Sequence, residues 1–269
     1  MSVKPAQKVS ELNFETYHAR QRHEVTPQGL RARATNIRAT DKFRSHHGIW
    51  EKLPYPGYAV VSMLNDSSEN ESLTGELENL QKLLAAKLND ANKYYLLPAD
   101  SFHQTIANTL SGERFKKHVI ARGIENQFPG IIAQAFEKIQ LNRSEGPVEM
   151  KLAGVGIFGS ALGILGTFSR KENFETIIRF REQFYSNPDL NRIDIRRTRP
   201  FIGHVTLMYV DGDFNEEEKF QLGEICAYVN KTLESRSLIF KITKAELRSY
   251  EDLSAFERQP HYPVYSFLK

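Results

Sequence analysis

The segment "FIGHVTLMYV" (residues 201–210) combines the apolar pattern of a buried strand with a His-x-Thr triplet formed by His204 and Thr206. Side chains two positions apart on a strand point to the same face of the sheet. The imidazole and the hydroxyl are therefore expected to project together, whereas Val205 between them faces the other way.

The chain contains a second triplet of the same kind, His103 and Thr105, in "DSFHQTIANTL" (residues 100–110). Polar Asn108 interrupts the apolar pattern there, so this strand is expected to end early. In each half of the chain, a helix and a His-x-Thr strand are followed by another helix and further strands. This repeated order predicts one α+β domain built from two similar lobes. If the two strands pack side by side, two imidazoles and two hydroxyls meet in one cleft.

Hydrophobic periodicity supplies the remaining elements of this domain. Leucines at helical spacing, a proline near a helix start and an asparagine followed by three glutamates indicate helices, and runs of apolar and aromatic residues indicate strands. The predicted strands cover residues 58–64, 93–98, 237–250 and 262–268, and the predicted helices cover residues 77–88, 128–140 and 172–185 and a stretch that begins after Asn215.

Residues 152–168, "LAGVGIFGSALGILGTF", form an uncharged segment of 17 residues. This length lies at the lower limit for spanning a bilayer. Five glycines interrupt it, so two buried strands joined by a tight turn fit better. "GVGIFG" (154–159) matches the Gly-x-Gly-x-x-Gly pattern of dinucleotide sites, but such a site requires a helix to begin there. The residues that follow resemble a strand, and no membrane partner is expected.

The length of the chain and its cysteine content limit the class of protein. The chain has 269 residues and a single cysteine, Cys226, which excludes an intramolecular disulfide and a multi-cysteine zinc site. The first 30 residues contain no apolar run that would serve as a secretory signal. The sequence therefore predicts a cytoplasmic protein.

The net charge of +3 is unevenly distributed. Residues 1–52 hold ten Lys or Arg and five Asp or Glu, a balance of +5, and "RIDIRRTRP" (192–200) adds a second basic cluster. We expect an irregular basic N-terminal arm with some helix (1–52), able to contact RNA or to regulate access to the cleft. The remainder (53–269) is expected to be a single domain whose lobes interleave, at approximately 53–150 and 151–269. Basic clusters also occur simply as solvated faces.

Two imidazoles and two hydroxyls in one cleft suit phosphodiester chemistry. Because histidine has an ordinary pKa of about 6.5, one neutral and one protonated copy are expected near neutral pH. The neutral copy accepts a proton from water or a ribose hydroxyl, and the protonated copy donates one to the departing oxygen. Threonine hydroxyls donate to the non-bridging oxygens. This chemistry requires no metal and no other cofactor. The alternative is two half-buried histidines bonded to neighbouring threonines.

The paired triplets resemble those of the 2H phosphoesterase superfamily, which includes RNA 2′,3′-cyclic phosphodiesterases and the 2′–5′ RNA ligase group. "AELRSY" (245–250) and "HYPVYSFL" (261–268) are similar to the closing strands of that superfamily. "KFRSHHGIWEKLPYPGYAVVSML" (42–64) and "YYLLPADSFHQTI" (94–106) are similar to an uncharacterised bacterial branch. The resemblance extends over roughly residues 42 to 269.

This resemblance implies a bilobal, pseudo-symmetric α+β fold in which two antiparallel-rich sheets face a central cleft, with helices outside. It implies that His103 and His204 form the acid–base pair and that Thr105 and Thr206 bind the substrate phosphate. Four further side chains are candidates for substrate contact, with a surface or packing role as the alternative for each: Arg197, Arg199, Arg248 and Tyr262.

The sequence therefore predicts a metal-independent phosphodiesterase that acts on a cyclic phosphate or an RNA-terminal phosphodiester. The alternative is an RNA- or nucleotide-binding protein that has the same cleft without turnover. The sequence leaves open the substrate, the assignment of acid and base, the hydrolase or ligase direction, and the oligomeric state.

Overall fold

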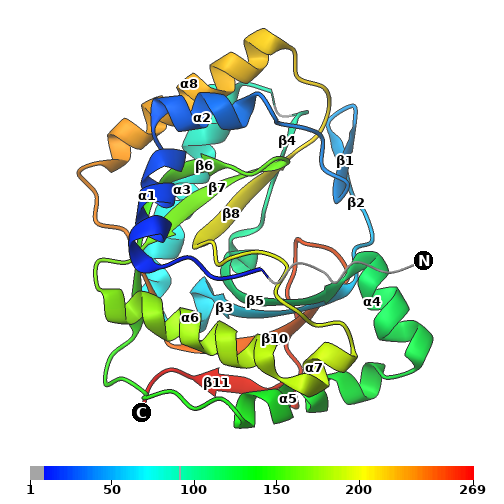
Figure 1. Ribbon diagram of the computed structural model, residues 1–269. Coiled ribbons are helices and arrows are strands. Elements are labelled where there is room, and N and C mark those ends of the chain that lie inside the picture. Colours follow the sequence, from blue (N-terminus) through cyan, green and yellow to red (C-terminus); the bar gives the residue numbers. More distant parts are fainter. Residues whose placement is uncertain (1–8, 91) are drawn as a thin grey trace, which may run out of the picture.

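The computed structural model describes residues 9–90 and 92–269 and has an α+β architecture. Figure 1 shows two sheets, one in each half of the view, with helices outside them. The helices are α1 (Phe14–Glu24), α2 (Pro27–Ala34), α3 (Glu71–Leu88), α4 (Gly112–His118), α5 (Phe128–Glu137), α6 (Lys171–Ser186), α7 (Pro188–Arg192) and α8 (Glu216–Leu233). The strands are β1 (Phe43–His46), β2 (Ile49–Lys52), β3 (Gly57–Met63), β4 (Tyr94–Leu96), β5 (His103–Ser111), β6 (Val148–Ile157), β7 (Ala161–Thr167), β8 (His204–Val210), β9 (Ile239–Ile242), β10 (Lys244–Tyr250) and β11 (Val264–Ser266).

The two larger sheets are antiparallel throughout. One has the strand order β11-β10-β3-β5, and the other has the order β4-β8-β7-β6-β9. Each sheet takes strands from both halves of the chain, and residue 150 lies inside β6. Strands β1 and β2 form a separate hairpin. The chain therefore crosses repeatedly between the two sheets, which ties both into one core.

Helices cover the outer faces of both sheets. Helices α2 and α8 pack on β6 and on each other, and α3 packs on α8 and β8. At the other sheet, α4 and α6 contact β5, and α5 contacts β11. Apolar side chains at helical spacing explain this arrangement, because Leu77, Leu80 and Leu84 all point inward from α3. At the start of α8, Asn215 and Glu218 form the capping box that the sequence suggested in part.

The glycine-rich segment forms two paired strands, as predicted. Strands β6 and β7 are antiparallel neighbours, and Gly159 adopts a φ of 62° in the turn between them. Because a strand follows the Gly-x-Gly-x-x-Gly stretch, no helix begins there to face a pyrophosphate. Among the described residues, no helix is both long enough and apolar enough to cross a membrane.

Residues 9–34 contain the helices α1 and α2, which pack into the core, so this part of the expected arm is not separate from the domain. Residues 1–8 of the expected arm lie outside the described residues. Tyr17 of α1 is fully buried, and its hydroxyl donates to the Gly166 carbonyl at 2.6 Å and accepts from the Gly203 N–H at 3.2 Å. A Cβ on Gly203 would lie 2.5 Å from that hydroxyl, so only glycine fits beside it. Gln21 donates to the carbonyls of Gly166 and Gly203. Two of the arm's basic side chains, Arg31 and Arg33, are paired with carboxylates.

Candidate active site

Strands β5 and β8 bring both His-x-Thr triplets to the same cavity. His103, Thr105, His204 and Thr206 all line a space of about 230 Å³. Strand β5 is the edge strand of one sheet, β8 lies one strand in from the edge of the other, and the two are in contact. Residues from opposite halves of the chain therefore meet where the two sheets approach each other.

A β-bulge follows the threonine in each motif strand. The pairing of β5 with β3 and of β8 with β7 each slips by one residue directly after Thr105 and Thr206. Because of the extra residue, the next side chain that faces the cavity comes three positions after the threonine instead of two. Asn108 and Tyr209 therefore both line the cavity. The expectation that β5 ends early at Asn108 is therefore wrong, because the strand continues to Ser111.

The two imidazoles are held by equivalent hydrogen bonds. Nδ1 of His103 donates to the Ser101 carbonyl at 2.7 Å, and Nδ1 of His204 donates to the Ile202 carbonyl at 3.0 Å. A carbonyl can only accept, so Nδ1 carries the proton in both rings and Nε2 is the atom that gains or loses one. Phenylalanine rings support both imidazoles, with centroid distances of 4.1 Å for Phe256 and His103 and 4.9 Å for Phe158 and His204.

Burial lowers the pKa of both histidines. Desolvation by the surrounding protein brings the pKa of His103 and that of His204 to about 4. The positive charge of Arg248 adds to this effect at His103, and Arg199 and the other imidazole add to it at His204. Both rings are therefore neutral near pH 7 without a ligand. This corrects the expectation of one neutral and one protonated copy, which used the ordinary pKa of histidine.

Gln104, the residue between His103 and Thr105, connects the two motif strands. Its side chain is fully buried, and its Oε1 accepts from the His204 backbone N–H at 2.6 Å. Its Nε2 donates to the carbonyls of Ile202 and Thr105, at 3.2 Å and 2.7 Å. Gln104 had no predicted role. A polar residue on the buried face of an apolar strand could have indicated this role, because the equivalent position in the second triplet is the apolar Val205.

A buried arginine supports both strands from behind. Arg181 of α6 donates to the carbonyl of Ile106 in the β5 bulge at 2.7 Å and to the carbonyl of Arg199, ahead of β8, at 3.1 Å. Its charge is paired with Glu11 at 2.8 Å, and Glu11 also accepts from the Phe201 N–H at 2.6 Å. The side chains of Arg181 and Glu11 are only 2% and 3% exposed, so the ion pair is desolvated. Its stability therefore depends on the hydrogen bonds that these two side chains form with the backbone.

Two cationic side chains line the same cavity. Arg199, a predicted substrate contact, lies there and has no ion pair with any residue in the described ranges. Lys42 was not predicted; its Nζ lies 3.6 Å from the centre of the Tyr55 ring and 2.7 Å from Asp41. The cavity therefore offers imidazoles, hydroxyls and positive charge together, a set suited to a phosphate group.

The other three predicted contacts do not line this cavity. Arg197 forms an ion pair with Glu11 at 3.2 Å, and the Tyr262 hydroxyl donates to Ser249 at 3.2 Å. Arg248 is held by Asp66 at 2.9 Å and by Glu246, which is fully buried. These partners account for all three as structural residues, although the charge of Arg248 still influences His103.

Comparison with the first of two solved structures supports the fold. The conserved protein of unknown function ATU0111 from Agrobacterium tumefaciens aligns with a TM-score of 0.57 at 14% identity, covering 81% of this chain and 88% of its own. TT0787 of Thermus thermophilus aligns with a TM-score of 0.41 at 14% identity, covering 80% of this chain and 98% of its own. No curated protein matches the chain.

A protein-family model described as 2H-phosphodiest, a domain of unknown function (DUF1868), matches residues 42–159. The matched segment contains β3, β5 and the first triplet, and the second triplet lies beyond it. Over residues 42–159, the chain is therefore similar to the 2H-phosphodiest family.

Proposed function

We propose that the protein is a metal-independent phosphodiesterase that acts on a cyclic phosphate or an RNA-terminal phosphodiester. His103 and His204 are the general acid–base pair, and Thr105 and Thr206 hold the phosphate. The observation that carries this proposal is the presence of all four side chains around one cavity, although they come from different sheets. The superfamily supports phosphodiesterase-type chemistry in general.

The reaction uses the free Nε2 atoms. One neutral imidazole removes a proton from water as the water oxygen attacks phosphorus. The other imidazole, in its protonated form, donates a proton to the departing oxygen as the P–O bond breaks. A bound phosphodiester anion raises the pKa of the adjacent imidazole, because the negative charge stabilises the imidazolium. Substrate binding thus causes one of the two histidines to become protonated, whereas both are neutral in the free protein.

The phosphate is stabilised by donors already in place. The hydroxyls of Thr105 and Thr206 donate to the non-bridging oxygens, where negative charge increases in the transition state. Lys42 and Arg199 add positive charge in the same cavity. The Nδ1 bonds to backbone carbonyls hold both rings in one orientation before substrate arrives.

The equivalent hydrogen bonds and bulges on β5 and β8 support a pseudo-symmetric, two-lobed arrangement with interleaved lobes. In such an arrangement, either histidine can serve as the base. The orientation of the substrate then decides which one does.

The test is hydrolysis of the four nucleoside 2′,3′-cyclic phosphates, with products separated by chromatography. We expect turnover by the parent protein and a loss of about 10²- to 10⁴-fold in His103→Ala and in His204→Ala. His261→Ala serves as the control, because His261 is exposed and lies outside the cavity. Cyclic nucleotides that bind but are released unchanged would identify a binding protein instead.

A further inference from the structure

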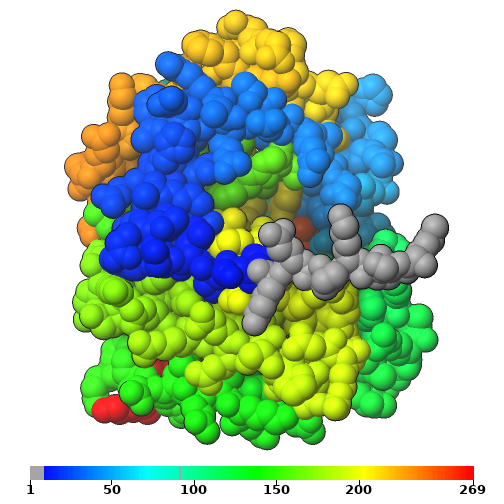
Figure 2. All heavy atoms as spheres, in the orientation of Figure 1, coloured from blue at the N-terminus to red at the C-terminus, as the bar shows by residue number. Residues whose placement is uncertain are grey.

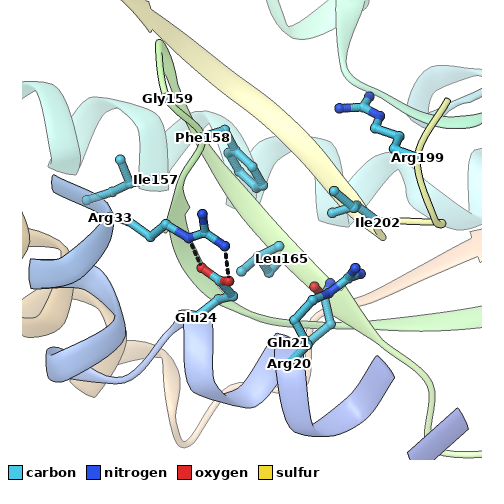
Figure 3. Close-up of a pocket in the computed structure, with 10 residues that line it drawn as sticks. All are labelled: Arg20, Gln21, Glu24, Arg33, Ile157, Phe158, Gly159, Leu165, Arg199 and Ile202. Atoms are coloured by element: carbon cyan, nitrogen blue, oxygen red, sulfur yellow. Dashed lines mark hydrogen bonds and ion pairs between the residues drawn. The ribbon is translucent and has the colours of Figure 1, made fainter. Parts of the chain in front are cut away.

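A second cavity, of about 300 Å³, lies beside the candidate active site. It is lined by residues of α1, α2 and the β6–β7 hairpin and by the segment ahead of β8 (Figure 3). In Figure 2 the surface is hollowed where the blue N-terminal helices meet green and yellow residues. The mechanism described above does not use this space.

The second cavity adjoins the His204 side of the active site. Arg199 lines both cavities. Phe158, which packs against the His204 ring, and Ile202, whose carbonyl holds the His204 Nδ1 proton, both line the second cavity. A ligand whose phosphate lies between the two histidines can therefore extend past Arg199 into this space.

The charge in the second cavity is not balanced. Three arginines, Arg20, Arg33 and Arg199, line it together with one glutamate, Glu24. Figure 3 shows that Glu24 and Arg33 bond to each other, so this pair is neutral. Arg20 and Arg199 have no carboxylate partner in residues 9–90 and 92–269. Glu24 and Glu11 attract Arg20 without forming an ion pair with it, so the guanidinium groups of Arg20 and Arg199 remain available to a ligand.

Arg20 is poised to accept an anion. One of its terminal nitrogens donates to the Phe201 carbonyl at 2.7 Å, which fixes the guanidinium and leaves its other N–H groups without a hydrogen-bond partner among the described residues. Burial lowers the pKa of Arg20, a sign that its charge has lost solvation. An anion placed beside a desolvated guanidinium restores that solvation and forms charge-assisted hydrogen bonds.

We propose that this cavity binds a second phosphate, so that the preferred substrate is a nucleotide with another phosphate beyond its scissile phosphodiester. Arg20, together with Arg199, which lies between the two cavities and serves both phosphates, offers the charge-assisted donors that a phosphate monoester dianion accepts. The apolar side chains of Phe158 and Ile202 provide a surface for the sugar or base between the two phosphates. The position of the first phosphate rests on the proposed function.

The test measures binding without turnover. Isothermal titration compares adenosine 3′,5′-bisphosphate with adenosine 3′-monophosphate and adenosine 5′-monophosphate. We expect the bisphosphate to bind at least about 10-fold more tightly than either monophosphate. A further titration of each monophosphate contains inorganic phosphate as well. The free phosphate should not raise the monophosphate affinity to that of the bisphosphate, because the second phosphate of the bisphosphate is covalently attached.

Two variants probe the second cavity in opposite directions. Arg20→Gln should reduce bisphosphate affinity to the monophosphate level, and Arg20→Lys should recover part of the preference. Glu24→Gln releases Arg33 from its partner and should increase the preference several-fold. Arg31→Gln is the control, because it removes the same charge from α2 at an exposed pair with Glu224 outside the cavity. Thermal unfolding of each variant confirms that it is folded.

If the parent protein binds the bisphosphate and the monophosphates equally well, the second site is wrong. The second site is also wrong if Arg20→Gln and Glu24→Gln both keep the parent's ratio of bisphosphate to monophosphate affinity. If no cyclic phosphate is hydrolysed but the preference is present and depends on Arg20, the second site stands and the proposed hydrolysis fails.

Discussion

The two motif strands, β5 and β8, hold their histidine and threonine in the same way, but the residues that surround the two strands differ. Both have a half-buried histidine and threonine, an Nδ1 bond to the carbonyl two residues earlier, and a bulge after the threonine. In β5 the intervening residue is Gln104, which bonds to the other strand, whereas in β8 it is Val205, which packs in the core.

The surroundings of the two imidazoles differ as well. His103 lies against Phe256, and Tyr250 and Leu253 line the same cavity. Arg248 is paired with Asp66 and with the fully buried Glu246. His204 lies against Phe158 at the edge of a second cavity that contains unpaired arginines. In the proposed function, the two similar motif strands carry out the same proton transfers, and their unequal surroundings set the direction in which a substrate extends.

Removing either imidazole is the strongest test of this equivalence. His103→Ala and His204→Ala should each lower kcat/KM by about 10²- to 10⁴-fold, because each ring is assigned one proton transfer. The parent should show a bell-shaped pH profile with its optimum below pH 6.5, since burial brings the pKa of both rings to about 4. Steady-state rates from pH 4 to 9 measure this.

Each histidine variant should lose a different limb of the pH profile. If one variant retains parental rates, that histidine is not part of the acid–base pair and the equivalence of the strands is only structural. Loss of the same limb in both variants would show that the rings do not divide the two roles.

The two threonines extend the comparison to the phosphate. Thr105→Val and Thr206→Val should each lower kcat by about 10²-fold, because each removes one hydroxyl donor to the developing charge. Thr176→Val is the matched control, since its hydroxyl donates to the Glu172 carbonyl within α6. Rates measured with saturating cyclic nucleotide separate this effect from weaker binding. A parental kcat in either variant would remove that threonine from the site.

Gln104 marks the clearest difference between the strands. Gln104→Met should lower the free energy of unfolding by about 1 to 3 kcal/mol, because the His204 N–H and the Ile202 carbonyl lose a partner. Turnover should also fall, since the position of His204 relaxes. Urea denaturation measures the stability. Gln221→Met, on the exposed face of α8, is the control. Unchanged stability in Gln104→Met would show that the strands are held together without this contact.

The smallest expected effect is the dependence of stability on pH. The unfolded histidines bind protons below about pH 6.5, but the folded ones resist protonation until about pH 4. Acidification therefore favours the unfolded state, and each of the two histidines should lower the free energy of unfolding by about 1 to 2 kcal/mol between pH 7 and pH 5.

A variant with both histidines replaced by glutamine should lose stability less steeply over this interval, as measured by urea denaturation at pH 7, 6 and 5. Parallel curves for parent and variant would show that the imidazoles are solvated. A phosphate-containing buffer should reduce the slope of the parent, because the bound anion favours the protonated rings.

Local sequence patterns were sufficient to predict several parts of the structure. The strands that carry the two triplets, the glycine-rich hairpin and the α8 cap depend on side chains within a few residues of each other. Alternation along a strand also places each histidine and its threonine on one face, so the pairing of those side chains followed directly from their spacing.

Other parts of the candidate site depend on packing between distant segments. Composition predicted an irregular arm with some helix over residues 1–52, whereas Tyr17 and Gln21 bond to Gly166 of β7 and to Gly203, directly ahead of β8. The candidates Arg197 and Arg248 were chosen for their charge, and they proved to have carboxylate partners far away in the chain.

The sequence by itself determined the candidate catalytic groups of this protein, two imidazoles and two hydroxyls on two strands, because spacing along a strand is a local property. Only the tertiary structure decided that these strands share one cavity, that bulges turn Asn108 and Tyr209 into it, and that both histidines are neutral near pH 7. The physical reason is that strand register, desolvation and charge pairing arise from contacts between residues far apart in the chain.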